Sequence, residues 1–442
     1  MSLRRKIRST LKDWKTQPNR PALLVTGARQ IGKTYSIREF GTTEYDCYLE
    51  INFIETPSAM AIFEGDLDAR TLIASLTAFS DRPLVPGKTL IFLDEIQECP
   101  RARTAMKFLV EDGRFDYIES GSLLGVQYKE VPSYPVGYER IVRMYPLSLE
   151  EFYWAIGVQQ ETLDLAWRAT VELREVPEAI HARLLKAFCE YVVVGGMPAA
   201  VSTFLRTQDM GLVKEVQGSI LDLYKQDIAK YGTRKAHIRS IFEFIPAELD
   251  KKNKRFKLSD LAKTARMERY ASDFMWLADA GVALPCYNVT APVAPLAINT
   301  QHNLFKLYLC DIGLLAAQVT SSERLDLLQG RLGVNWGSIL ENAIAQELAA
   351  HGISLHYFDK SKYGEVDFLV EEDATIVPIE VKSGNDFRAH KALTNIMDVD
   401  EWQLGEAVVL CKGNVGRAGN VTYLPWYAAM FMRKDPSEAK GV

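Results

Sequence analysis

The chain has 442 residues, of which 48% are apolar and 25% are charged, and its formal net charge is −5. At about 100–200 residues per domain, about two to four globular domains are expected. The acidic balance argues against a wholly basic nucleic-acid coat protein. No apolar run reaches the ~18 residues of a membrane span, and the first residues lack the apolar core of a secretory signal. Six scattered cysteines without C-x-x-C spacing predict free thiols in a reducing cytoplasm, with no membrane association.

The first expected element is a basic helix from Leu3 to Lys15, where apolar residues recur at helical spacing. A second basic run, KKNKRFK, occupies residues 251–257. Either segment could meet phosphates, but a charge run is more commonly a solvated face, and we favour that interpretation for each segment alone. The cations of residues 1–20, which contain the first segment, are Arg4, Arg5, Lys6, Arg8, Lys12, Lys15 and Arg20.

Three short apolar runs predict buried strands, at Ala22–Thr26, Thr89–Leu93 and Phe115–Ile118. The first run leads directly into the sequence GARQIGKT, which is followed by a helix expected over Lys33–Phe40. Strands that alternate with helical patterns are typical of an α/β fold with a doubly wound parallel sheet.

The sequence GARQIGKT fits the phosphate-binding loop G-x-x-x-x-G-K-[ST] at every fixed position. Its glycines let backbone N–H groups close around phosphates, Lys33 supplies a positive charge, and the Thr34 hydroxyl is placed for Mg²⁺. The helix that follows directs its N-terminal dipole at the anion. We therefore predict an ATP site formed by Gly27, Ala28, Arg29, Gln30, Ile31, Gly32, Lys33, Thr34 and Tyr35.

An acidic strand end, LIFLDEIQ at residues 90–97, accompanies this loop. Asp94 is expected to hold Mg²⁺, and Glu95 to orient or deprotonate the attacking water. The carboxyl ends of parallel strands share one edge of a sheet, so these groups should lie near the phosphate loop. Ser120 and Ser122 end the next strand and could sense the γ-phosphate, although a helix N-cap is an equal alternative.

An ATPase of this kind often places an arginine against the γ-phosphate. Arg140 and Arg143, in the segment PVGYERIVRMYPLSLEEF, are candidates, and a surface position is the alternative for each. The sequence does not decide whether such an arginine acts within one chain or from a neighbouring copy.

The middle of the chain, residues 147–235, is mostly helical in pattern and is interrupted by VVVGGMP at 192–198. Residues 258–284 contain two helical stretches around a break, with Gly281 closing the second, which favours a helix-turn-helix followed by wing strands. The second stretch is poor in Lys and Arg, so a protein-binding winged helix is at least as reasonable as one that reads DNA.

Near the C-terminus, a helix is expected over Ser338–Ala350, with strands at 356–358, 365–370 and 375–381. The period of two along a strand puts Glu380 and Lys382 on one face, beside Asp367 of the neighbouring strand. With Glu341 from the helix, these side chains could bind a divalent metal at Glu341, Asp367 and Glu380 and activate a water for phosphodiester attack. The alternatives are an ion-pair set on a sheet face and a non-cleaving binding domain.

The motif order GARQIGKT, LDEIQ, Ser-Gly-Ser, PVGYERIVRMYPLSLEEF and YVVVGGMP resembles the prokaryotic, archaeal-type AAA ATPases. The resemblance covers nearly the whole chain. It implies ATP binding, a winged-helix segment and a C-terminal restriction-endonuclease-like domain of the PD-(D/E)xK kind. The proline of that motif is replaced here by Val366, a departure that family members commonly tolerate.

We therefore expect a P-loop ATPase that uses ATP and Mg²⁺ to control a nuclease-like domain acting on nucleic acid, with a second divalent ion in that domain. The alternative is an ATP-switched regulatory or scaffold protein that cuts nothing. DNA, a protein partner and a second copy of the chain are the candidate partners. The expected divisions are a basic helix at 1–19, an ATPase core at 20–150, a helical subdomain at 151–236, a winged-helix domain at 237–325 and a nuclease-like domain at 326–442.

Overall fold

The computed structural model describes residues 2–122, 135–231, 234–251, 253–257, 267–318, 324, 326, 328, 336–372 and 374–433. The chain forms two compact units, which are described separately. The N-terminal unit comprises Arg4–Tyr145 and Asp279–Gly281, and the C-terminal unit comprises Met1–Leu3, Pro146–Ala278 and Val282–Val442. All six cysteines are free, as the sequence predicts.

The N-terminal unit is built on a five-stranded, wholly parallel sheet in the order β2-β3-β4-β1-β5. The parallel α/β sheet predicted from the sequence is thereby confirmed. This order places β4 between the strand that precedes GARQIGKT and the acidic strand. The strands are β1 (Ala22–Gly27), β2 (Cys47–Asn52), β3 (Thr89–Asp94), β4 (Asp116–Ser122) and β5 (Glu139–Arg143).

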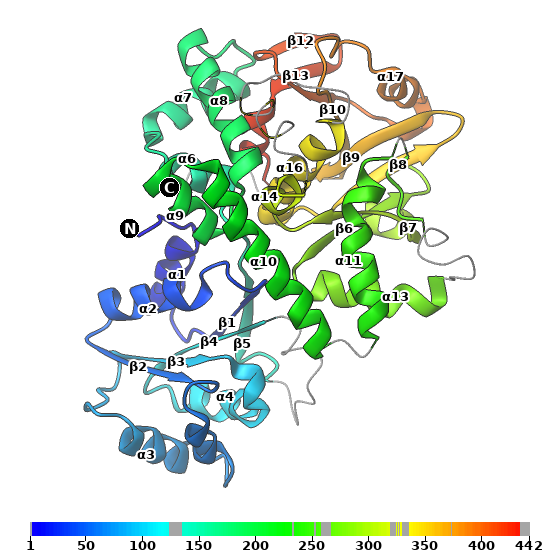
Figure 1. Ribbon diagram of the computed structural model, residues 1–442. Coiled ribbons are helices and arrows are strands. Elements are labelled where there is room, and N and C mark those ends of the chain that lie inside the picture. The colour runs from blue at the N-terminus through cyan, green and yellow to red at the C-terminus, as the bar shows by residue number, and fades with distance from the viewer. Residues whose placement is uncertain are drawn as a thin grey trace. The chain divides into compact units, whose positions relative to one another are not determined.

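Helices cover both faces of this sheet, with α1 and α2 on one side and α3 and α4 on the other (Figure 1). Every residue of β1 and β3 is buried, as expected of strands packed on two faces. The helix α1 begins four residues later than the expected Leu3. The helices are α1 (Ile7–Thr16), α2 (Lys33–Glu44), α3 (Ala69–Phe79) and α4 (Pro100–Asp112), with 3₁₀ turns η1 (Pro57–Phe63) and η2 (Ile96–Glu98).

The C-terminal unit begins with a series of helices. Among the described helices none is by itself long and apolar enough to cross a membrane, and α8 and α9 meet that test only as a pair, bent by 120°. The helices are α6 (Leu149–Ala155), α7 (Gln160–Val171), α8 (Glu178–Val194), α9 (Pro198–Thr207), α10 (Met210–Tyr231), α11 (Lys235–Leu249) and α13 (Met267–Asp279).

The glycine pair of VVVGGMP forms the corner between α8 and α9. A Cβ on Gly196 would lie 2.1 Å from the carbonyl oxygen of Leu147, and one on Gly195 would lie 2.3 Å from Asp311 Oδ1. The N–H of Gly196 donates to Asp311 Oδ2 at 2.6 Å. The two glycines therefore let three segments distant in the sequence pack backbone to backbone.

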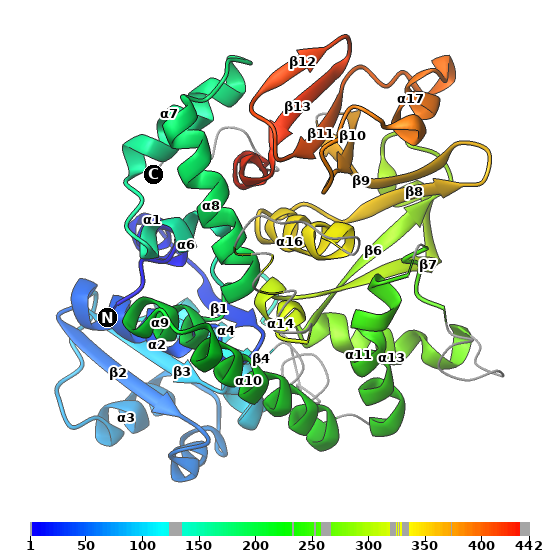
Figure 2. The same ribbon diagram turned by 45° about the horizontal axis from the view of Figure 1, so that its top comes forward.

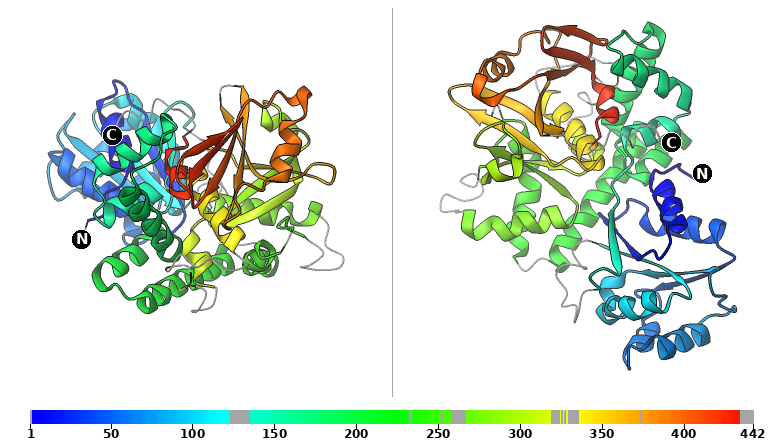
Figure 3. Two further views of the ribbon diagram at one scale, coloured as in Figure 1. Left: turned by 90° about the horizontal axis from the view of Figure 1, so that it is seen from above. Right: turned by 180° about the vertical axis from the view of Figure 1, so that it is seen from behind.

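The second half of the C-terminal unit is a mixed, eight-stranded sheet in the order β12-β13-β11-β10-β9-β8-β6-β7. Figures 2 and 3 show α16 on one face of this sheet and α17 on the other. The strands are β6 (Ala283–Val289), β7 (Thr300–Leu309), β8 (His356–Lys360), β9 (Gly364–Glu372), β10 (Thr375–Val381), β11 (Ala407–Cys411), β12 (Gly416–Ala418) and β13 (Val421–Pro425). The remaining elements are η3 (Leu296–Asn299), α14 (Ile312–Ala316), α16 (Trp336–Ala350), α17 (Lys391–Met397), η4 (Asp400–Trp402) and η5 (Trp426–Phe431).

The topology bears on the expected division near residue 325, which stays a prediction. The strands β6 and β7, which we expected to be the wing of a separate domain, pair with each other and, through β6, with β8 of the C-terminal sheet. The first expected helix of the helix-turn-helix, at 258–266, lies outside the described residues, and the second is α13, followed by Gly281 with φ +72°. The C-terminal sheet thus draws its strands from both sides of the expected boundary.

Candidate functional site

The loop GARQIGKT joins β1 to α2 at the carboxyl edge of the parallel sheet. Gly27 ends β1 with φ +147°, and a Cβ there would lie 2.2 Å from the carbonyl oxygen of Met144. Gly32 has φ +90° and immediately precedes Lys33, the first residue of α2. Gln30 also adopts a positive φ, 65°, which is uncommon for a residue with a side chain. The predicted loop therefore lies between a strand and a helix N-terminus, as phosphate binding requires.

The amine of Lys33 is held by the loop's own backbone. Its Nζ donates to the carbonyl oxygens of Gly27 at 3.1 Å and Ala28 at 2.8 Å. Burial lowers the pKa of Lys33 to about 8, although the Glu95 and Asp94 carboxylates oppose the shift. Its two hydrogen-bond acceptors are neutral backbone carbonyls, so this ammonium can still attract an anionic phosphate.

Asp94 ends β3 and lies within hydrogen-bond reach of the loop. Its Oδ2 accepts from Thr34 Oγ1 and from Asn52 Nδ2, both at 3.0 Å, and its Oδ1 accepts from the hydroxyl of Ser120. All three donors are neutral. Burial raises the pKa of Asp94, and the nearby Glu95 carboxylate adds to the shift. A carboxylate beside a hydroxyl offers the oxygen ligands that Mg²⁺ prefers.

Glu95 follows directly and adopts a left-handed backbone, with φ 55° and ψ 46°. Its Oε2 accepts from the side-chain amide of Gln97, and the residue is half-buried. The left-handed turn ends the strand and keeps this second carboxylate near Asp94 at the same edge of the sheet.

Of the two candidate arginines, Arg143 lies near this edge, whereas Arg140 pairs in register with Leu23 near the opposite end of the sheet. Arg143 lies in β5 in register with Thr26 of β1, and its guanidinium lies 5.3 Å from the Tyr145 ring centroid. Arg140 lies three residues earlier in the strand and donates to Gln17 at 3.2 Å. Tyr35 is exposed, at 51% of its surface. The side chain of Ser122 lies outside the described part of the chain.

Asn52 belongs to the site, although the sequence analysis did not single it out. It ends β2 in register with Asp94, and its Oδ1 accepts from the backbone N–H groups of Ile54 and Glu55. The signal was present, because a short polar residue ends an alternating strand, CYLEIN. What the sequence lacked was the strand order, which makes β2 the neighbour of β3.

A second group of charged side chains lies in the C-terminal unit. The structure brings together the four predicted residues, with Glu341 from α16, Asp367 from β9, Glu380 from β10, and Lys382 directly after β10. Asp367 Oδ2 accepts from the N–H of Val381 at 2.8 Å, and Lys382 Nζ donates to Glu380 Oε1 at 2.8 Å. We call Glu341, Asp367 and Glu380 the acidic cluster.

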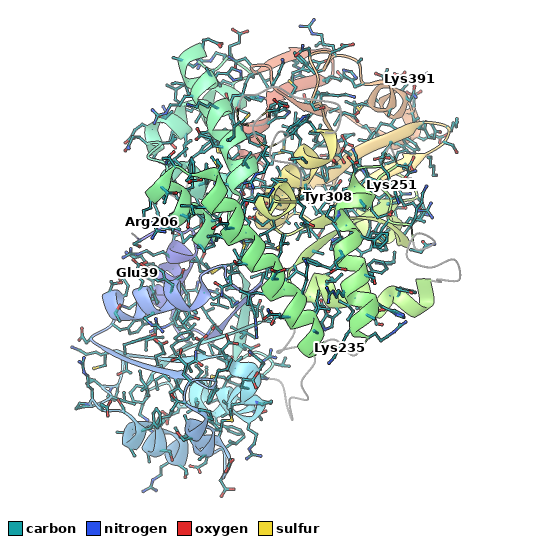
Figure 4. All side chains as sticks on the ribbon, viewed as in Figure 1. Glu39, Arg206, Lys235, Lys251, Tyr308 and Lys391 are labelled. Atoms are coloured by element: carbon teal, nitrogen blue, oxygen red, sulfur yellow. The ribbon has the colours of Figure 1, made fainter. Side chains whose placement is uncertain are left out.

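Two further lysines, absent from the predicted set, occupy this cluster. The amine of Lys306, on β7, is fully buried and lies 2.5 Å from Glu365 Oε1, 3.4 Å from Glu341 Oε2 and 3.8 Å from Asp367 Oδ1. Lys254 also forms an ion pair with Glu341. Tyr308, labelled in Figure 4, donates from β7 to Glu341 Oε2 at 3.1 Å.

The amines of Lys306 and Lys254 influence the pKa values of the acidic cluster. Burial favours a neutral Glu341, but the ammonium groups of Lys306 and Lys254 override it and lower the pKa of that carboxyl. Burial, together with the Glu341 and Glu380 carboxylates, raises the pKa of Asp367. Among the residues that the structure describes, no three His, Cys, Asp or Glu side chains are placed to hold a metal ion. Glu380 and Lys382 form an ion pair, and the metal-binding role of the acidic cluster stays a prediction.

Comparison with known families locates an AAA domain in the first part of the chain. Residues 19–153 match the AAA domain model. Two domains of unknown function match downstream, DUF8612 over residues 185–325 and DUF4143 over residues 336–428. No curated protein matches the chain. The N-terminal unit therefore contains a domain similar to AAA domains, and the restriction-endonuclease-like character of the C-terminal part stays a prediction.

Several solved structures share a distant likeness with the chain. The Orc1 protein of Aeropyrum pernix, solved in complex with DNA, is 12% identical over 73% of this chain and 90% of its own, with a TM-score of 0.28. The RuvB Holliday junction branch migration motor of Thermotoga maritima is 14% identical over 64% and 89%, with a TM-score of 0.30. Cdc6p of Pyrobaculum aerophilum is 12% identical over 74% and 93%, with a TM-score of 0.24. Because these TM-scores are low, the function is inferred from the residues of this chain alone.

Proposed function

We propose that the N-terminal unit binds ATP with Mg²⁺ and hydrolyses it. The observation that carries the proposal is the contact between the Thr34 hydroxyl and the Asp94 carboxylate, 3.0 Å apart at the sheet edge where Lys33 begins α2. Two motifs 60 residues apart thus supply oxygen ligands and a cation to one small region. This is the arrangement that phosphoryl transfer to water needs, since its catalysis is largely positioning and charge stabilisation.

Each residue has a separate role in this proposal. The loop's N–H groups and the Lys33 amine bind the phosphates, and Thr34 and Asp94 hold Mg²⁺, which neutralises charge on the phosphate oxygens. Glu95 orients or deprotonates the attacking water. Asn52 and Ser120 fix the Asp94 carboxylate by donating to it.

The direct test measures Mg²⁺-ATP affinity and phosphate release in the full chain. Lys33→Ala should abolish nucleotide binding, whereas Glu95→Gln should retain binding and lower turnover by about 100-fold or more, because it removes the base but keeps the shape. Lys12→Ala is the matched control, since its amine pairs with Glu44 on the surface. Normal ATP turnover in Lys33→Ala would disprove the assignment of the loop.

For the C-terminal unit we propose a nuclease-like domain that acts on nucleic acid under the control of ATP. The convergence of Glu341, Asp367 and Glu380 from three elements, with Lys382 directly after the third, supports this function. The competing proposal, an ATP-switched regulatory or scaffold protein, is supported by the buried amine of Lys306 among the same carboxylates. A winged-helix contact to a partner and self-association belong to this second proposal.

A nicking assay separates the two proposals. Wild-type protein is incubated with single- and double-stranded DNA and RNA, with Mg²⁺ or Mn²⁺, in the presence and absence of ATP. Under the nuclease proposal cleavage appears and Asp367→Ala abolishes it, while Glu401→Ala, which removes an exposed carboxylate in η4, leaves it unchanged. Absence of cleavage under every condition supports the regulatory function.

A further inference from the structure

One arginine ahead of the first helix binds the phosphate-loop backbone. Arg5 Nη1 donates to the carbonyl oxygen of Ile31 at 2.8 Å, and its Nη2 donates to the carbonyl oxygen of Tyr145 at 2.7 Å. These acceptors lie 26 and 140 residues away in the sequence. The planar guanidinium fork is the side chain best suited to bridge two acceptors in this way.

The bond to Ile31 constrains the group that should meet the phosphate. In a planar trans peptide the C=O and the next N–H point in opposite directions. By holding the oxygen of Ile31, Arg5 therefore fixes the opposite direction for the N–H of Gly32. Gln30 and Gly32 both have positive φ, so this stretch departs from the commonest backbone conformations and benefits from an external support.

The second acceptor belongs to a segment that is itself tied to the loop. The N–H of Met144 donates to the carbonyl oxygen of Thr26 at 2.8 Å, and Gly27 packs directly against the carbonyl oxygen of Met144. The backbone of residues 144–145 is thus held in place beside the start of the loop. Arg5 links the other end of the same loop, at Ile31, to this backbone segment.

We propose that Arg5 is a positioning residue for nucleotide binding, which holds the phosphate loop open to a nucleoside triphosphate by bridging Ile31 and Tyr145. This inference rests on the proposed ATP-binding function of the loop. It also assigns a specific role to one cation of the basic N-terminal segment, whereas Arg8 and Lys12 form surface ion pairs with Glu44.

The test compares Arg5→Ala and Arg5→Lys with Arg8→Ala in the full chain. Arg8→Ala removes the same group from the same segment, at a side chain 46% exposed and 3.9 Å from its partner. Binding of Mg²⁺-ATP is measured by titration, and steady-state turnover gives kcat and KM. We expect Arg5→Ala to weaken binding about tenfold, the value of roughly one charge-assisted hydrogen bond. Arg5→Lys should lie between wild type and Arg5→Ala, because one amine retains the charge but lacks the fork.

The division between kcat and KM separates positioning from a general structural role. Loss of phosphate-loop geometry should raise KM and leave kcat within about twofold, because the same N–H groups bind substrate and transition state. A merely structural role would lower kcat through a smaller folded fraction and leave KM unchanged, and that result would overturn the inference. So would equal losses in Arg5→Ala and Arg8→Ala, which would indicate bulk charge. If wild type itself binds no nucleotide, the proposed function fails first.

Discussion

In the phosphate loop the amine of Lys33 is bound by two backbone carbonyl oxygens, whereas in the C-terminal unit the amine of Lys306 is surrounded by carboxylates. The acidic residues differ in the same way. Asp94 is held by a hydroxyl, an amide and a second hydroxyl, all neutral, while Glu341 is paired with two lysines.

The two sites therefore differ in whether their charged side chains are already paired with side chains of opposite charge. In the phosphate loop the direct hydrogen-bond partners of Lys33 and Asp94 are neutral groups, so the charge of each can act on a bound phosphate or metal. In the acidic cluster the counter-charges are supplied by the chain itself, and any added cation must compete with buried ammonium groups. Residue types alone predicted a binding site in both places, and only the partners distinguish them.

The largest change in the free energy of unfolding should come from removing the Lys306 amine, which pairs with carboxylates of the acidic cluster. Lys306→Met would leave Glu365 and Asp367 without their buried partner, and breaking a buried ion pair from one side costs about 3–5 kcal/mol. Lys382→Met is the matched control, since its side chain is 24% exposed and, in the described part of the chain, pairs with Glu380, so we expect a smaller loss than for Lys306→Met. Urea unfolding at neutral pH measures both, and equal small losses would show that Lys306 does not balance the cluster.

An intermediate effect, on ATP turnover, tests whether Asp94 of the phosphate-loop site binds Mg²⁺. Asp94→Asn keeps the size of the side chain but removes its charge, so ATP turnover should fall about 100-fold with a much smaller loss of nucleotide affinity. Asp116→Asn makes the same change at the start of β4, where the carboxylate pairs with Arg20, and should leave turnover unchanged. The measurement is phosphate release as a function of Mg²⁺ concentration. Equal rates in the two variants would contradict the role of Asp94.

The smallest effect concerns pH. The pKa of Lys33 is lowered to about 8, and binding of a triphosphate should raise it by favouring the charged form. Affinity is then fully present well below pH 8 and lost as the pH rises, by about fivefold between pH 8 and 9. Calorimetric titration of ATP analogues from pH 6 to 9 checks this. Lys33→Arg, which stays charged throughout, should bind with no such slope, and a flat wild-type profile would refute the prediction.

The sequence predicted the strands that lead into each motif, because β1 and β3 are continuous apolar runs buried on both faces. It did not predict which strand neighbours which, since that depends on long-range pairing, and so Asn52 was missed. Lys306 was missed for a related reason. It lies in the strand TQHNLFKLYL, and nothing local shows that this lysine is buried against α16. In the sequence Arg5 is one of several neighbouring cations, and only the structure shows its two carbonyl acceptors.

The eight-stranded sheet has a consequence for how this protein could be divided, in the laboratory or in evolution. The matched families separate between residues 325 and 336, yet the strands on either side of that point belong to one sheet. A fragment starting at residue 326 would expose the edge of β8 that now pairs with β6, and it would carry the acidic residues without Lys306. Such a fragment should aggregate. Recombination between genes would therefore need to transfer both halves together.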